Sequence, residues 1–241
     1  MAHSSKETLS IGWCDNGATD GKFTEGLVYT LVVSGSRGIP IHNAIRVQGN
    51  QIARQRQALI DMWYDEVKTD WILWVDSDIV LTFDVLKTLW DTADKVTKPV
   101  VSGVYFISKQ MEGSLMQPMP VLFNDTDTDT QVKYLHPLPE NQVVKCDSAG
   151  FGLVLMHRNA FKQMRDKFGK DFFFAESNGI GDEFIGEDIA FFRKLKASGV
   201  QLYAHTGALV KHMKRFAFDV NYYNLFWQAV AVAEAREKKD G

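Results

Sequence analysis

The most constraining feature of the sequence is a short apolar run that ends in two acids. Trp71-Ile-Leu-Trp-Val75 is continuously apolar and runs directly into Asp76-Ser77-Asp78. Such a run is typical of a parallel strand that is covered on both faces of a sheet. Ligands of open α/β sheets bind beyond the carboxyl ends of these strands. Two carboxylates there are costly to bury without a partner, so we expect them to be functional and to hold Mn²⁺ or Mg²⁺.

The same acidic spacing also occurs where it predicts no site. Asp125-Thr-Asp127-Thr-Asp129 lies in a polar stretch without an apolar strand before it. It also fails as a calcium loop, because Thr130 stands in place of the turn glycine. We therefore expect a solvated loop at this segment.

Composition excludes several classes of protein. The chain has 241 residues, 45% of them apolar, and a net charge of −3, which gives no reason to expect nucleic acid as a partner. Its two cysteines, Cys14 and Cys146, do not make a disulfide framework and favour a reducing compartment. No secretory signal and no apolar run long enough for a membrane span is found, so we expect a cytoplasmic protein.

Apolar runs of strand length alternate with segments of helical period. This alternation predicts one α/β domain over residues 1–241, with a mostly parallel central sheet flanked by helices. Residues 108–142, with four prolines, are expected to form a loop-rich insertion, and 221–241 a C-terminal helix. The expected strands are 9–14, 42–47, 71–75, 100–106, 121–123, 152–156, 201–204 and 208–211, and the other expected helices are 22–34, 50–66, 83–95 with Thr82 as its N-cap, 159–168 and 186–198.

Several motifs together resemble a known family. Ile72-Leu-Trp-Val-Asp-Ser-Asp78 resembles the signature of GT-A glycosyltransferases, and further segments match in the right order. Asn50-Gln-Ile-Ala-Arg54-Gln-Arg56 resembles a helix that precedes the signature, and Asp147-Ser-Ala-Gly150-Phe151-Gly152 resembles the donor-sugar loop. Gly186-Glu187-Asp188 resembles the later acidic motif, and Val210-Lys-His212 resembles the strand end that completes the metal site.

The resemblance implies a single Rossmann-like GT-A domain that transfers sugar with the help of a metal ion. The implied donor is a nucleotide sugar, a UDP-sugar, and the acceptor is an unknown glycan, protein or small molecule. Compact proteins of this layout are frequent in phage genomes, which would place a phage-encoded member in the host cytoplasm. The sequence departs from the family pattern at Gln57, where Asn is frequent, and at Cys14-Asp15-Asn16-Gly17, where a proline-containing turn is usual.

The resemblance also implies the roles of individual residues. Asp78 and His212 are expected to bind the metal, and Asp76 to face the ribose and reach the metal through water. The residues expected to contact the nucleotide sugar are Cys14, Asp15, Asn16, Arg54, Arg56, Asp76, Ser77, Asp147, Gly150, Phe151, Gly152 and Lys214. The alternative for His212 is a surface histidine without a metal. The alternative for Gly150 and Gly152 is a plain turn before a buried strand.

Arg56 is expected to be buried. Residues two apart on a helix point about 200° apart, so Arg54 and Arg56 face different ways. Arg56 shares an apolar stripe with Ile52, Leu59, Ile60 and Trp63, and an arginine there requires an anionic or planar partner. That partner is either the nucleotide or an acid of the protein.

Glu187 and Asp188 begin a predicted helix, where the helix dipole favours anions. An inverting transferase also needs a carboxylate that deprotonates the acceptor hydroxyl. The resemblance gives this role to Asp188 and acceptor binding to Glu187, whereas a retaining enzyme would not need the base. Two other functions stay open, namely a sugar-nucleotide pyrophosphorylase, although Asn16–Gly21 is not its glycine-rich phosphate loop, and a non-catalytic nucleotide- or sugar-binding module.

Overall fold

The computed structural model describes residues 7–110, 116–126, 132–177, 184–214 and 220–240. Within the chain, contacts separate two compact units, one of Met1–Ile107 with Met119–Met213 and one of Ser108–Pro118 with Lys214–Gly241. The single domain expected over residues 1–241 stays a prediction.

The helices of the described residues are α1 (Gly21–Ser34), α2 (Ile52–Asp61), the π-helical η1 (Met62–Val67), α3 (Phe83–Thr92), α4 (Arg158–Phe168), α5 (Glu187–Ala197) and α6 (Val220–Asp240). The strands are β1 (Leu9–Asp15), β2 (Ile41–Gln48), β3 (Trp71–Val75), β4 (Ile79–Val80), β5 (Val100–Val104), β6 (Phe106–Gln110), β7 (Met116–Pro120), β8 (Leu122–Asp125), β9 (Val132–Tyr134), β10 (Val143–Cys146), β11 (Ser148–Ala149), β12 (Leu153–His157), β13 (Glu176–Ser177), β14 (Phe184–Ile185), β15 (Leu202–Leu209) and β16 (Lys211–His212).

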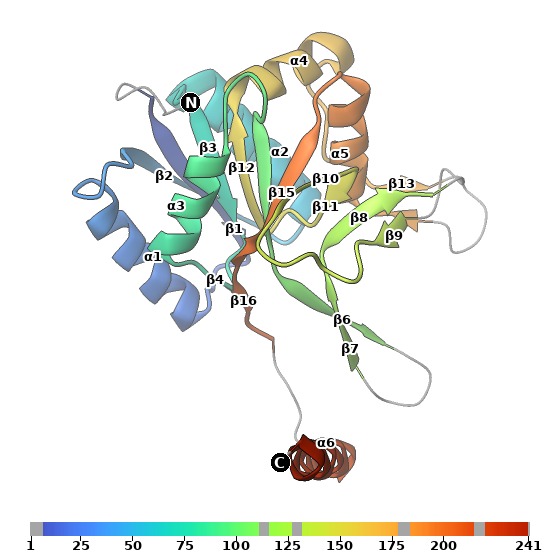
Figure 1. The fold of residues 1–241 in the computed structure, drawn as a ribbon. Coiled ribbons are helices and arrows are strands. Elements are labelled where there is room, and N and C mark those ends of the chain that lie inside the picture. The colour runs from blue at the N-terminus through green and yellow to red at the C-terminus, as the bar shows by residue number, and fades with distance from the viewer. Residues whose placement is uncertain (1–6, 111–115, 127–131, 178–183, 215–219, 241) are drawn as a thin grey trace. The chain divides into compact units, whose positions relative to one another are not determined.

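The first unit is built around one seven-stranded sheet, in the order β10-β15-β5-β12-β3-β1-β2 (Figure 1). β1, β2, β3, β5 and β15 run in one direction, and β10 and β12 run in the other. The predicted α/β fold with a mostly parallel central sheet is therefore confirmed. The carboxyl ends of the five parallel strands meet at one edge of the sheet, and β12 begins at that edge.

The central strand β3 is covered on both faces, as its sequence predicted. Trp71, Leu73 and Val75 pack in a buried cluster with side chains of α1 and α3. Ile72 and Trp74 point to the opposite cluster, which includes side chains of α2, η1, α4 and α5. All five are at most 2% exposed. This burial holds β3 rigidly, so the backbone of Asp76 and Asp78, which follow it, starts from a fixed position.

Most predicted element boundaries lie within a few residues of the observed ones. Thr82 caps α3, since its hydroxyl accepts a hydrogen bond from the Val85 amide at 3.3 Å. The helix predicted over 50–66 begins at Ile52 and continues as the π-helical η1. The two strands predicted over 201–204 and 208–211 are largely one strand, β15, which pairs with β5 on both sides of a register shift between Ala204 and Leu209.

The segment 108–142 holds more regular structure than the loop-rich insertion that was predicted. It contains β7, β8, β9 and most of β6, which belong to a two-stranded and a three-stranded sheet. Pro118 and Pro120 lie in the two-stranded β6-β7 sheet, where both strands are edges and a missing N–H is tolerated. Asp125 ends β8 and is not in a solvated loop, whereas Asp127 and Asp129 lie outside the described residues.

The predicted C-terminal helix is confirmed as α6, and Gly241 lies outside the described residues. On α6 the Trp227 ring contacts the rings of Tyr223 and Phe226, at centroid distances of 6.2 and 5.4 Å. A search of the described residues finds no helix with the length and apolar character needed to traverse a bilayer.

Candidate active site

Two short strands bring Asp78 and His212 together at the carboxyl edge of the sheet. β3 ends at Val75, and a tight turn follows, in which the Ile79 amide donates to the Asp76 carbonyl at 3.0 Å. The chain then pairs antiparallel with β16, so that His212 lies opposite Ile79. The Met213 amide also donates to the Asp78 carbonyl at 2.7 Å. The strand pairing therefore fixes the backbone of both predicted metal ligands.

Both ring nitrogens of His212 face oxygen atoms. Its Nδ1 lies 3.0 Å from the Phe106 carbonyl oxygen, which can only accept, so Nδ1 carries the proton. Nε2 then faces Asp78 Oδ2 at 3.2 Å, and the ring stands edge-on to Tyr105. A histidine that binds a metal usually donates its other N–H to a carbonyl or carboxylate. The pair has the donor chemistry and the outer support for a divalent cation.

Asp76 is turned toward a different partner. Its two carboxylate oxygens lie 3.2 and 3.3 Å from Arg56 Nη2, and its amide donates to the Gly152 carbonyl at 3.0 Å. Among the described residues, no group of three or more His, Cys, Asp or Glu side chains could hold a metal ion. A cation bound by Asp78 and His212 would therefore complete its shell with water and substrate oxygens, as Mg²⁺ commonly does.

Arg56 is buried and links two elements of the site. Its side chain is 6% exposed, and Nη1 donates to Glu187 Oε1 at 2.8 Å while Nη2 contacts Asp76. The guanidinium also lies 5.2 Å from the centre of the Phe151 ring. Burial would lower the pKa of Arg56, but the charges of Asp76 and Glu187 outweigh it and raise the pKa above its usual value. Arg56 thus has acids of the protein as partners, and its expected contact with the nucleotide stays a prediction.

Asp188 occupies the first turn of α5, beside Glu187. Its Oδ1 accepts a hydrogen bond from the Ile189 amide at 2.8 Å. A Cβ on Gly186 would lie 2.9 Å from the same oxygen, so the glycine at the N-cap leaves room for this carboxylate. Burial raises the pKa of Asp188 although the charge of Arg56 lowers it. A raised carboxyl pKa is what a general base near neutral pH requires.

Asp147 is engaged by charged groups of the protein. Lys196 Nζ lies 2.6 Å from its Oδ1, and the Asp125 amide donates to its Oδ2 at 2.8 Å. Burial would raise the pKa of Asp147, but the hydrogen bonds from Lys196 and Asp125 lower it. Lys196 also pairs with the Asp125 carboxylate at 2.8 Å. The expected sugar contact of Asp147 stays a prediction, and what the structure assigns to it is an ion-pair network.

The glycines of the predicted donor-sugar loop pack against Tyr105. A Cβ at Gly150 would lie 2.3 Å from the Tyr105 hydroxyl, and one at Gly152 would lie 2.8 Å from its ring. The Gly152 amide donates to that hydroxyl at 3.2 Å. Phe151, between them, is 1% exposed and packs edge-on against Trp74. The loop is thus shaped by the core, and a sugar contact by its glycines stays a prediction.

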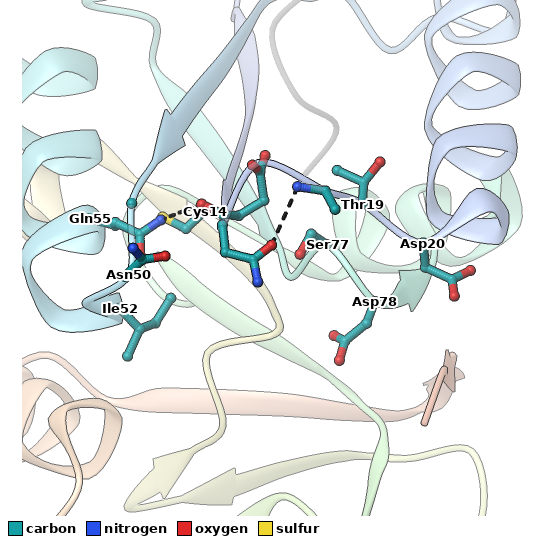
Figure 2. Close-up of a pocket in the computed structure, with 12 residues that line it drawn as sticks. Cys14, Thr19, Asp20, Asn50, Ile52, Gln55, Ser77 and Asp78 are labelled. Atoms are coloured by element: carbon teal, nitrogen blue, oxygen red, sulfur yellow. Dashed lines mark hydrogen bonds between the residues drawn. The ribbon is translucent and has the colours of Figure 1, made fainter. Parts of the chain in front are cut away.

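A pocket of about 590 Å³ lies along the ends of β1, β2 and β3 (Figure 2). Its size is within the usual range for small-molecule sites. It brings together five of the predicted residues, at the end of β1 and in the turns after β1 and β3, and it adds residues from α2, from the segment after β2 and from the segment that leads into α1. The lining residues are Cys14, Asp15, Asn16, Ala18, Thr19, Asp20, Gly49, Asn50, Ile52, Gln55, Ser77 and Asp78.

The Asp15 carboxylate is already fully engaged. Arg46 donates to it from Nε and Nη2 at 2.6 and 2.7 Å, the Gly17 amide at 2.8 Å and Trp13 Nε1 at 3.1 Å. The hydrogen bonds from Arg46 are the main cause of its lowered pKa. Burial raises the pKa of the neighbouring Cys14 thiol to about 12, so the thiol is neutral. This part of the pocket therefore carries little net charge.

Of the other residues predicted to contact the nucleotide sugar, only some lie at the pocket. Ser77 lines the pocket, and its carbonyl accepts from the Asp20 amide at 3.0 Å. Arg54 is exposed on α2, and Lys214 belongs to the second unit. Gln57, the departure from the family pattern, accepts from the Phe172 amide at 2.9 Å and donates to the Lys170 carbonyl at 2.6 Å.

The sequence analysis missed Gln55, Asn50 and Asp20, which line the pocket. It also placed Ile52 on the buried stripe of α2, whereas Ile52 is 38% exposed and lines the pocket. A signal for Gln55 was present, because this amide sits next to Arg56 on the buried side of the helix. Asp20 reads as the N-cap of α1, and it does accept from the Lys22 amide at 2.8 Å.

Neither a protein-family model nor a curated protein matches the sequence. Solved structures do match. A197 from STIV superposes with a TM-score of 0.53 at 19% sequence identity, over 87% of this chain and 86% of that chain. At this identity the likeness shows the fold, which agrees with the sheet and helix layers described above.

Other solved structures with a similar architecture include glycosyltransferases. One is GalNAc-T7 with UDP, GalNAc and Mn²⁺, with a TM-score of 0.49 at 11% identity, over 87% of this chain and 43% of that chain. The chain thus spans less than half of GalNAc-T7. The other is a glycosyltransferase involved in the glycosylation of the major capsid of PBCV-1, with a TM-score of 0.48 at 11% identity, over 86% of this chain and 95% of that chain.

The burial of Arg56 between two acids predicts a structural cost when it is removed. Arg56→Ala leaves Asp76 and Glu187 facing each other without a counter-charge, and we expect the free energy of unfolding to fall by about 1–3 kcal/mol. Urea unfolding at pH 7 measures it, with Arg54→Ala on the exposed side of α2 as the matched control. Equal unfolding midpoints for the two variants would contradict the described role of Arg56.

The raised pKa of Asp188 predicts that replacing this residue stabilises the fold, by an amount that depends on pH. The folded protein holds the Asp188 proton more tightly than the unfolded chain, so this group destabilises the fold as pH rises from the unfolded pKa through the raised folded pKa. Asp188→Asn should therefore be more stable than the native chain at pH 7, and the difference should shrink toward pH 4. Urea midpoints at both pH values test it; a variant that is less stable at pH 7 would refute the burial effect.

Proposed function

We propose that this chain is a metal-dependent glycosyltransferase that moves a sugar from a UDP-sugar to an acceptor hydroxyl, with inversion at the anomeric carbon. The observation that carries the proposal is the pairing of Asp78 with His212, whose Nδ1 donates to the Phe106 carbonyl, where Asp78 lines a pocket of about 590 Å³. Asp188, a carboxylate with a raised pKa, is coupled to the same group of residues through Arg56.

The charges around the pocket favour a metal-assisted donor. Asp20 and Asp78 line it, Asp15 is neutralised by Arg46, and no lysine or arginine is among the lining residues that the structure describes. A nucleotide diphosphate would bring further negative charge to a pocket whose described lining includes carboxylates. Mn²⁺ or Mg²⁺ held by Asp78 and His212 would supply that charge and act as a Lewis acid toward the leaving group.

The protein's own groups would then handle the acceptor. The acceptor oxygen forms a bond to the anomeric carbon as the bond from that carbon to the diphosphate oxygen breaks, and the bonding pair leaves with the diphosphate. The hydroxyl proton passes to the carboxylate of Asp188, which the Ile189 amide holds in place through Oδ1. Glu187, oriented by Arg56, is proposed to bind the acceptor through its second oxygen.

Metal-dependent nucleotide binding is the first prediction of this proposal. UDP with Mn²⁺ should raise the melting temperature of the purified chain, since a ligand at 100 times its dissociation constant adds roughly 2.7 kcal/mol. UDP without metal should raise it much less. Asp78→Asn should abolish the Mn²⁺-dependent part of the shift while the unliganded protein stays folded.

Asp166→Asn, at an exposed acid of α4, serves as the matched control and should keep the full shift. An unchanged metal response in Asp78→Asn would refute the metal site. Release of free sugar from UDP-sugars in the same samples separates an enzyme from a binding module, because a binding module releases none.

Proton transfer by Asp188 is the second prediction. Asp188→Asn keeps the shape of the side chain but removes its basicity, so sugar transfer should fall by roughly 10²-fold or more. Binding of UDP with Mn²⁺ should stay nearly unchanged, as measured by calorimetry. Near-native transfer by this variant, or a product with the anomeric configuration of the donor, would remove Asp188 from this role.

A further inference from the structure

We infer that Gln55 selects the nucleobase of the donor, by accepting a hydrogen bond from the N3–H of uracil. The inference rests on the proposed function, because it takes the pocket along β1, β2 and β3 as the place of the nucleotide. It concerns the end of the pocket away from Asp78, where Cys14, Asn50 and Gln55 lie (Figure 2).

The amide of Gln55 is fixed by the ends of two neighbouring strands. Its Nε2 donates to the Asp15 carbonyl at 2.8 Å and to the Val47 carbonyl at 3.1 Å. An amide nitrogen has two hydrogens, so both are used. A Cβ on Gly49 would lie 3.1 Å from Gln55 Cγ, and the absence of a side chain there leaves room for this arrangement. The orientation of the amide is therefore set, because a flip would place an oxygen against two carbonyl oxygens.

The side chain of Gln55 can offer a ligand only its oxygen, Oε1, which accepts hydrogen bonds. Gln55 is 7% exposed and lines the pocket, and no hydrogen bond to its Oε1 is found among the described residues. This oxygen is not one of the buried polar atoms that lack a partner, so it is open to the pocket. A ligand that covers it without supplying a donor would leave it unpaired, which is costly. With both hydrogens engaged, Gln55 cannot donate to the ligand. It therefore discriminates by requiring an N–H at this position.

Uracil matches the surrounding groups. It presents one ring N–H between two carbonyl oxygens, whereas N3 of cytosine has no hydrogen and would face Oε1 as a second acceptor. Asn16 Oδ1 accepts from the Ala18 amide at 3.3 Å, which leaves the Asn16 Nδ2 as a donor for a carbonyl oxygen of the base. Ile52, 38% exposed, offers an apolar surface for the face of the ring. Asp20 and Asp78 lie at the opposite end, so a base near Gln55 directs its diphosphate toward the proposed cation (Figure 2).

Calorimetry with Mn²⁺ and three nucleotides tests the inference on the native chain. UDP should bind roughly tenfold or more tightly than N3-methyl-UDP, which lacks the donor, and than CDP. Equal affinity for UDP and N3-methyl-UDP, or tighter binding of CDP than of UDP, would overturn the role of Gln55 while the proposed function stands. Absence of binding by all three nucleotides would overturn both.

Gln55→Met supplies a second measurement. The variant should bind UDP about tenfold more weakly, and it should no longer distinguish UDP from N3-methyl-UDP. Gln51→Met is the matched control, because Gln51 is exposed at the start of the same helix and its side chain makes no capping hydrogen bond. A Gln55→Met variant that still prefers UDP over N3-methyl-UDP as the native chain does would overturn the inference. If Gln55→Met fails to fold, the comparison of nucleotides on the native chain decides alone.

Discussion

A single buried guanidinium holds the two sides of the candidate active site together. Arg56, on α2, contacts Asp76 after β3 and Glu187 at the start of α5, and it lies over the ring of Phe151 before β12. Without its charge, neighbouring carboxylates would repel each other in a poorly solvated place. With it, Asp76 and Glu187 are paired, and Asp188 is the acid on which the cost of burial falls. One ion-pair junction thus positions the acids and gives them different chemistry.

The pocket beside this junction is divided by charge. Toward β1 and β2, the Cys14 thiol is neutral, Asp15 is balanced by Arg46, and Gln55 is an amide whose donors are engaged. Toward β4 and α1, the lining includes two carboxylates, that of Asp20 and that of Asp78, which pairs with His212. A molecule with an uncharged ring at one end and an anionic, cation-binding group at the other would complement this arrangement. Nucleotides have that distribution, and so the division suits the proposed donor.

Much of the fold follows from local patterns in the sequence, whereas the partners within the site do not. The apolar run of β3, the Thr82 cap and the position of Asp188 at a helix start could be predicted, because each depends on neighbouring residues. Arg56 was predicted to need a partner, but its pairing with Glu187, 131 residues away, depends on how the layers stack. The Arg46–Asp15 pair likewise depends on β1 lying beside β2. The spacing of apolar residues along the chain does not predict either of these two ion pairs.

The short β4–β16 pairing has a consequence for the stability of the chain as a whole. Asp78 and His212 are 134 residues apart in sequence, yet their side chains meet through only two paired residues on each strand. A cation held between them would act as a cross-link that closes this long loop. Because such a cation would bind the folded chain and not the unfolded one, its binding free energy would add to the stability of the fold. If the proposed cation is bound there, its removal would weaken the short β4–β16 pairing, which joins the segment after β3 to the segment after β15.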